Sequence, residues 1–144
     1  MEPLERVAVL LALMRELEGV MQQEGQLLRS MRLERLDEVQ AEKATLAEAY
    51  EIEVRAFRKD PQAAAGLPDE ARRTLEEASR SFQQAVRANA RAIEAGRVVV
   101  EGIVRRLGES LMGRRTMRTG YAAEAPVHEA PAGRVIAVAF DRRI

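Results

Sequence analysis

The chain contains no cysteine and no tryptophan, and its 144 residues include one histidine, two tyrosines and three phenylalanines. Without cysteine the protein has neither a disulfide framework nor a thiolate metal ligand, and this composition is expected in a reducing cytosol. Because aromatic side chains are scarce, the apolar 47% of the chain consists largely of aliphatic residues and alanine. Small apolar side chains favour long helices that pack closely around a narrow core.

Long apolar runs are also absent. No stretch of 18 or more apolar residues occurs, so the sequence predicts no helix that spans a membrane. The first five residues, Met1-Glu2-Pro3-Leu4-Glu5, lack the basic start of a secretory signal. The length suits one domain with its own core. We therefore expect a cytoplasmic protein without stable membrane insertion.

Neither sign of charge dominates, because 23 basic residues balance 23 acidic ones. Residues 1–66 carry nine basic and thirteen acidic side chains, whereas residues 113–144 carry six basic and three acidic ones. Nucleic-acid-binding proteins concentrate far more positive charge and often interleave aromatic residues for base stacking. We therefore expect no nucleic-acid partner. The alternative of this kind is a helical RNA- or DNA-associated protein that uses Arg114, Arg115 and Arg118.

Residue patterns for catalysis are missing as well. The single histidine, His128, lies between Pro126 and Pro131. This position excludes a phosphotransfer histidine on a bundle helix and the Glu-x-x-His ligands of di-iron bundles. The chain has no glycine-rich phosphate-binding loop and no arrangement of serine, histidine and carboxylate for nucleophilic catalysis. The sequence therefore predicts a protein without enzymatic activity, metal or cofactor.

What the chain does have is three stretches in which apolar residues recur every three or four positions, the pattern of amphipathic helices. The first stripe comprises Leu4, Val7, Leu11, Met14, Met21 and Leu28. The second comprises Leu33, Leu36, Val39, Leu46, Tyr50 and Phe57. The third comprises Leu75, Phe82, Ala85, Ala92, Val99 and Ile103. The sequence therefore predicts an all-α protein.

Two breaks separate these stripes. Continuing the first stripe would place apolar residues at positions 32 and 35, but both are arginines, and the apolar residues stand one position later. This shift predicts a tight turn near residues 30–32. The second break is residues 60–68, with two prolines and one glycine. We expect helices near 3–29, 33–59 and 68–110 in an antiparallel three-helix bundle over residues 1–112, with Gly108 or Gly113 ending the last helix.

Residues 113–144 do not continue the helical pattern. Gly120, Pro126, Pro131 and Gly133 flank a stretch of small residues, and residues 134–140 alternate as a short strand does. We expect a C-terminal tail that is flexible or becomes ordered on a partner.

A single polar residue interrupts each apolar stripe: Glu24, Lys43 and Asn89. One interpretation is that Glu24 and Lys43 extend their charged ends to the rim of the core, while Asn89 fixes the register of the helices. The other interpretation is a polar spot inside an apolar groove, where it orients a bound peptide. Both remain open from the sequence.

The order of several short motifs resembles the FlgN family of flagellar type III export chaperones. In the first two helices the resemblance rests on Glu24, Leu27-Leu28, Leu33-Glu34-Arg35-Leu36 and Glu42-Lys43-Ala44-Thr45-Leu46. In the third helix and the tail it rests on Asn89-Ala90-Arg91-Ala92-Ile93-Glu94-Ala95 and Thr119-Gly120-Tyr121. The resemblance implies a cytosolic chaperone that binds the C-terminal helical region of the hook-associated proteins, which form the hook–filament junction. Such a chaperone prevents their premature assembly and delivers them to the flagellar export gate.

A helical client of this kind requires an apolar surface on the chaperone. Residues 97–112 carry more apolar side chains than one stripe of a bundle needs. We predict that Val100, Val104, Leu107 and Leu111 bind the client. The alternatives are that the tail covers them or that they pack locally against the first or second helix.

Tyr121 is the candidate for docking on the export gate, together with Arg114, Arg115 and Arg118. An amphipathic ring on a flexible segment offers a large contact area with few rotatable bonds. The alternative is that the ring packs back on the third helix. A rival for the whole chain is a structural coiled-coil adaptor that forms a homodimer and has no client. A chaperone is expected to be a monomer or a weak homodimer.

Overall fold

The computed structural model describes residues 1–115, and all secondary structure in this range is helical. The all-α prediction is therefore confirmed for this part of the chain. Its elements are α1 (Pro3–Arg29), a 3-10 turn (Leu33–Arg35), α2 (Leu36–Arg58), α3 (Pro61–Ala65) and α4 (Asp69–Arg115). The predicted tail lies almost entirely outside the described residues.

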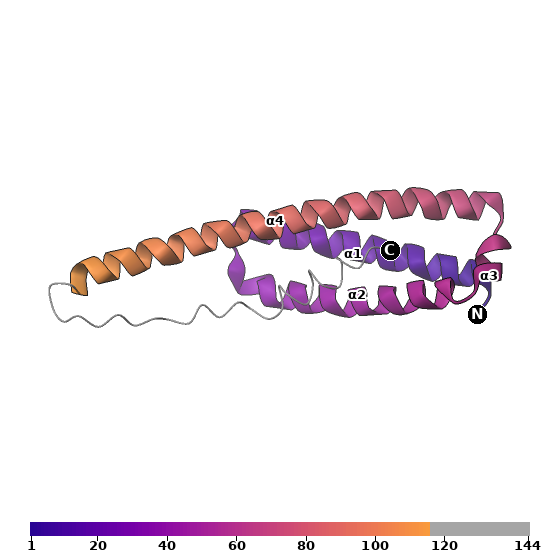
Figure 1. Cartoon of the computed structure of the whole chain (residues 1–144), viewed down its shortest axis with the longest axis horizontal. Coiled ribbons are helices and arrows are strands. Elements are labelled where there is room, and N and C mark those ends of the chain that lie inside the picture. The colour runs from indigo at the N-terminus through magenta and orange to yellow at the C-terminus, as the bar shows by residue number, and fades with distance from the viewer. Residues whose placement is uncertain (116–144) are drawn as a thin grey trace.

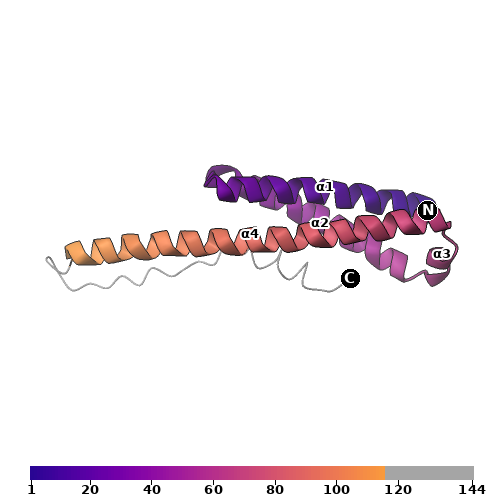
Figure 2. The ribbon, with the colours of Figure 1, turned by 90° about the horizontal axis from the view of Figure 1, so that it is seen from above.

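Three long helices, α1, α2 and α4, lie side by side, and the short α3 connects α2 to α4 at one end (Figure 1). Helix α1 packs against both α2 and α4. Figure 2 shows from a second side that α2 runs opposite to α1 and α4, whereas α1 and α4 run in the same direction. Contacts along the parallel pair progress accordingly, from Leu4 with Pro68, through Met21 with Asn89, to Leu28 with Gly96.

The break after α1 lies where the sequence predicted it, and its hydrogen bonds explain why the helix stops. The amide of Arg32 donates to the Leu27 carbonyl at 3.0 Å, and the amide of Met31 donates to the Leu28 carbonyl at 3.3 Å. These two bonds form a Schellman motif, which closes a helix through one residue in the left-handed conformation. That residue is Met31, with φ of 54°. Glycine usually occupies this position, so methionine here is only a weak turn signal.

The connection between α2 and α4 contains a helix that the sequence analysis missed. Helix α3 begins at Pro61, and the Asp60 carboxylate caps it by accepting a hydrogen bond from the Ala63 amide at 3.0 Å. Proline is well suited to the first position of a helix, because its missing amide would have no partner there. The five residues of α3 therefore turn the chain compactly.

Apolar side chains from the three long helices form the core. Its aromatic centre is the contact of Tyr50 on α2 with Phe82 on α4, whose ring centroids lie 5.0 Å apart and tilted by 50°. Both rings are buried, so they join α2 to α4 directly. The remaining members of this buried cluster are Leu10, Met14, Leu17, Met21 and Ala47.

Helix α4 is longer than the sequence predicted. We expected it to end near residue 110, at Gly108 or Gly113, but it continues to Arg115. A glycine ends a helix by adopting positive φ, and no glycine of the described residues does so. The predicted boundary at residue 112 therefore lies inside a helix.

Candidate partner-binding segment

The C-terminal part of α4 extends beyond the ends of α1 and α2, as both Figure 1 and Figure 2 show. Because Gly96 still contacts Leu28 in the last turn of α1, this part comprises the nineteen residues 97–115. We call them the projecting segment, and at 1.5 Å per residue they are about 28 Å long. Gly96 marks the point where α1 ends beside α4. A Cβ atom on Gly96 would lie only 2.9 Å from Leu28 Cδ2, so the last turn of α1 packs directly on the backbone of α4.

The projecting segment exposes apolar side chains that continue the core-facing side of α4. Ile103 follows Phe82, Asn89 and Gly96 at intervals of seven residues, so it occupies the same seam. Phe82 is 2% exposed, whereas Ile103 is 41% exposed and Leu107 is 58% exposed. At 100° per residue, six aliphatic residues fall within an arc of about 140° on this side. We call them the projecting stripe: Val99, Val100, Ile103, Val104, Leu107 and Leu111.

The four predicted client-binding residues all lie on the projecting stripe. Val104, Leu107 and Leu111 are exposed, and Val100 is half-buried. The alternative that they pack locally into the core is therefore wrong for the three exposed residues. The reason is helix length, because α1 ends at Arg29 and no other described helix runs beside the segment beyond Gly96.

Charged residues flank the start of the projecting segment. Arg97 forms ion pairs with Glu94 at 3.2 Å and with Glu101 at 3.8 Å. All three side chains are more than half exposed, so these pairs contribute little to stability.

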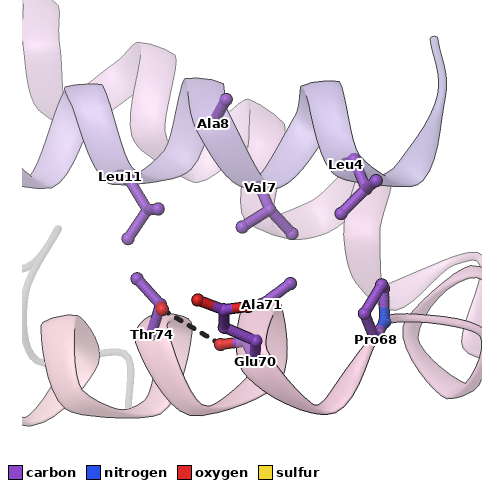
Figure 3. A pocket seen from close by; sticks show the side chains of 8 residues that line it. All are labelled: Leu4, Val7, Ala8, Leu11, Pro68, Glu70, Ala71 and Thr74. Atoms are coloured by element: carbon purple, nitrogen blue, oxygen red, sulfur yellow. Dashed lines mark hydrogen bonds between the residues drawn. The ribbon is translucent and has the colours of Figure 1, made fainter.

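A shallow groove of about 340 Å³ lies at the opposite end of the molecule, between the first turns of α1 and α4 (Figure 3). Its walls are mostly aliphatic, and the hydroxyl of Thr74 is already bonded to the Glu70 carbonyl at 3.0 Å. Small-molecule sites combine an apolar pocket with polar groups that converge on the ligand. Among residues 1–115, Glu70 is the only charged residue that lines this groove, so the described lining shows no such convergence. The groove is lined by Leu4, Val7, Ala8, Leu11, Pro68, Glu70, Ala71 and Thr74.

The three polar residues of the stripes meet in one buried network that links all three long helices. Lys43 on α2 donates to the Glu24 carboxylate on α1 and, at 3.0 Å, to the side-chain oxygen of Asn89 on α4. The Asn89 amide group donates to the Met21 carbonyl at 3.2 Å and to Glu24 at 3.3 Å. Gln40 donates to the other Glu24 oxygen at 3.3 Å. We call these four side chains, Glu24, Gln40, Lys43 and Asn89, the polar network.

This geometry corrects the interpretation that Glu24 and Lys43 extend to the rim. Both side chains have 0% exposure, and Asn89 has 6%. The two opposite charges lie on neighbouring helices and pair with each other, which offsets part of the cost of removing them from water. The second interpretation, a polar spot inside an apolar groove that orients a bound peptide, also fails for this structure, because Glu24, Lys43 and Asn89 are buried. Asn89 instead fixes α4 against α1.

Burial shifts the pKa values of two core side chains. Desolvation lowers the pKa of the Lys43 ammonium group, and the hydrogen bond and negative charge of Glu24 partly offset this change. Desolvation likewise raises the pKa of the Tyr50 hydroxyl, against the positive charge of Arg58. Both groups lie inside the core, so these shifts make the free energy of unfolding depend on pH.

Sequence reasoning missed Gln40 as a member of the polar network. Gln40 precedes Lys43 by three residues, which places both on one side of α2. This spacing was the available signal. Gln40 is exposed in part, so it closes the network at its outer edge.

The predicted docking residues lie at or beyond the limit of the structure. The backbone of Arg114 and Arg115 forms the end of α4. Their side chains are not described, and Arg118, Tyr121 and His128 lie outside the described residues. The docking prediction is therefore untested.

Comparisons with known proteins find no family model, no curated protein and no solved structure that matches this chain. Within residues 1–115, no helix combines the length and hydropathy that crossing a bilayer requires. In the same range, no three histidine or carboxylate side chains are grouped so that they could hold a metal ion. The assignment of a partner-binding site therefore depends on the geometry and exposure of the projecting segment alone.

Proposed function

We propose that this protein is a FlgN-like flagellar export chaperone, built on an antiparallel three-helix bundle, that holds a helical segment of its client on the projecting stripe. The observation that carries the proposal is an aliphatic stripe on a part of α4 that no other described helix covers. A contiguous patch of exposed apolar side chains usually marks an interaction site, whereas single exposed apolar residues are ordinary. The resemblance of the sequence motifs to the FlgN family supplies the identity of the client.

The shape of the stripe suits an amphipathic helix. Such a helix binds through residues spaced by three and four positions that enter an apolar groove or face. The projecting stripe presents side chains at the same spacing, and a client helix laid along it would extend the helix packing of the core. Burying aliphatic surface in this way stabilises a complex by about 25 cal/mol per Å² before ordering costs.

The client in this proposal is the C-terminal helical region of a hook-associated protein. Val100, Val104, Leu107 and Leu111 contact it in the cytoplasm and keep it from assembling early. Tyr121, with Arg114, Arg115 and Arg118, then docks the loaded chaperone on the export gate. The protein acts by binding alone, without catalysis or a cofactor.

A structural coiled-coil adaptor is the second candidate, because the same exposed stripe could close permanently against another copy. The two candidates differ in the strength of self-association. An adaptor forms a stable dimer at micromolar concentration, whereas a chaperone is monomeric or weakly associated until its client is present. Analytical ultracentrifugation of the full chain separates them.

Binding of a purified C-terminal peptide from a hook-associated protein of the same organism tests the proposed function. Val104→Asp should weaken binding at least tenfold, because a charge enters an apolar contact. Val98→Asp is the matched control, since Val98 is equally exposed at 57% but faces away from the projecting stripe. Equal affinities of the two variants would contradict the proposal, and circular dichroism checks that both remain helical.

A further inference from the structure

Four of the six residues of the projecting stripe have the same spacing when they are followed in either direction. Val100, Val104, Leu107 and Leu111 are separated by four, three and four residues. In an antiparallel pair of such helices, Val100 of one copy lies opposite Leu111 of the other, and Val104 lies opposite Leu107. Each of the four side chains then has an apolar partner. These four residues of the stripe are therefore complementary to the same four residues of a second copy.

The surroundings of the stripe accommodate a helix that is antiparallel to α4. Ile103 continues the seam of Phe82 and Asn89, so the stripe lies on the side of α4 that faces α1 and α2 in the core. Helix α2 already packs on that side in the antiparallel direction (Figure 2). The projecting segment of a second copy can take the same orientation beyond the end of α2.

The position of the turn between α1 and α2 disfavours a parallel pair. The stripe begins directly after Gly96, which contacts Leu28 in the last turn of α1. In a parallel pair, the α1–α2 turns of both copies would stand at the same level, between the two α4 helices. In an antiparallel pair, they stand at opposite ends of a segment about 28 Å long.

We propose that a second copy of this chain covers the projecting stripe, in an antiparallel pair of α4 helices, while no client is bound. Six aliphatic side chains per copy can bury only roughly half of the ~800 Å² per partner that standard stable interfaces bury. The pair is therefore weak and exchanges with monomers. A client helix needs the same side chains, so it displaces the second copy; this competition rests on the proposed function.

Disulfide cross-linking tests the pairing directly, because the chain has no cysteine of its own. Val100→Cys and Leu111→Cys are made in separate full-length chains that carry tags of different mass. After mixing and mild oxidation, the antiparallel pair predicts a disulfide-linked heterodimer. Each variant alone should link at least tenfold less, because identical positions lie about 16 Å apart along the axis, beyond the reach of a disulfide.

The controls separate the other arrangements. Val98→Cys mixed with Leu111→Cys should give no heterodimer, since Val98 faces away from the projecting stripe. Strong linking of Val100→Cys with itself would show a parallel pair and overturn the proposal. Absence of any linked product at the highest soluble concentration would overturn it as well. The variant Val104→Cys tests the remaining arrangement. If this variant is monomeric and its thiol resists thiol reagents, residues 116–144 cover the stripe, and the proposal is overturned as well.

Sedimentation in the presence of the client peptide distinguishes failure of this inference from failure of the proposed function. We expect wild-type dimers to dissociate as the peptide is added, and Val104→Asp to remain monomeric. If the peptide binds a chain that never dimerises, the pairing is wrong and the chaperone function stands. If dimers form but the peptide neither binds nor dissociates them, the function is wrong and the pairing stands.

Discussion

Lys43 on α2 donates a hydrogen bond to Asn89 on α4, with 3.0 Å between Nζ and Oδ1. The same ammonium group is paired with the Glu24 carboxylate on α1. One side chain therefore joins all three long helices. Its partner Asn89 lies two helical turns before Gly96, where α4 begins to extend past the end of α1. This arrangement fixes the register of α4, and with it the direction in which the projecting stripe faces.

Removing one charge of the buried pair should be far more harmful than removing both. Lys43→Met leaves the Glu24 carboxylate buried without its cation, and we expect the free energy of unfolding to fall by about 3–5 kcal/mol. The double variant Glu24→Leu with Lys43→Met replaces the pair by apolar groups and should lose much less, or gain stability. Urea denaturation measures both. The single variant Glu24→Leu completes the comparison. A double variant whose loss of stability equals the sum of the losses in Glu24→Leu and Lys43→Met would contradict this account.

The lowered pKa of Lys43 predicts a pH dependence of stability. In the unfolded chain the Lys43 ammonium group has its ordinary pKa of 10.5, so half of the groups are protonated at that pH. In the folded protein the same group loses its proton at lower pH. The unfolded state therefore binds more protons in the alkaline range below pH 10.5, and the free energy of unfolding rises with pH there. The raised pKa of Tyr50 adds a slope of the opposite sign as the pH approaches 10, but this slope is common to the wild type and to a variant that keeps Tyr50.

Denaturation midpoints between pH 8 and pH 10 measure this effect against the Glu24→Leu with Lys43→Met double variant. The wild type should gain stability relative to the double variant as the pH rises. A difference that stays constant over this range would show that burial does not lower the pKa of Lys43.

Met31→Gly should stabilise the turn between α1 and α2. A non-glycine residue in the left-handed conformation is disfavoured by about 1–2 kcal/mol, and Met31 is 41% exposed, so little packing is lost. We expect the melting temperature to rise by several degrees. Met31→Ala is the control, because alanine keeps the Cβ atom; it should leave the melting temperature unchanged or lower it.

Two glycines of α4 should respond to alanine with opposite signs. Gly96→Ala places a Cβ atom 2.9 Å from Leu28 Cδ2 and should destabilise the contact of α1 with α4. Gly102→Ala meets nothing within 4 Å and should favour the helix by up to about 1 kcal/mol. Thermal unfolding followed by circular dichroism compares them. Stabilisation by both substitutions would mean that the Leu28 side chain moves aside at little cost, so that its close contact with Gly96 does not hold α1 against α4.

Hydrophobic periodicity predicted the positions of the long helices because it reports which side of each helix is apolar. It could not show that Glu24 and Lys43 are buried, since burial of a charge depends on the group opposite it. It placed the turn at residues 30–32 but could not show that Met31 closes the helix, because methionine carries no turn signal. The excess of apolar residues after Arg97 was visible in the sequence. Their exposure depends on where α1 and α2 end beside α4, which is a property of the assembled fold.

Hydrogen exchange of the full chain with and without the hook-associated C-terminal peptide tests the central claim most directly. The account predicts that the peptide slows amide exchange in residues 97–112 and leaves the groove between Leu4 and Thr74 unchanged. The backbone amides of Glu24, Lys43 and Asn89 should exchange slowly in both samples, because these residues are already buried. Protection confined to the groove, or no protection in residues 97–112 at saturating peptide, would contradict the assignment of the projecting stripe as the client-binding site.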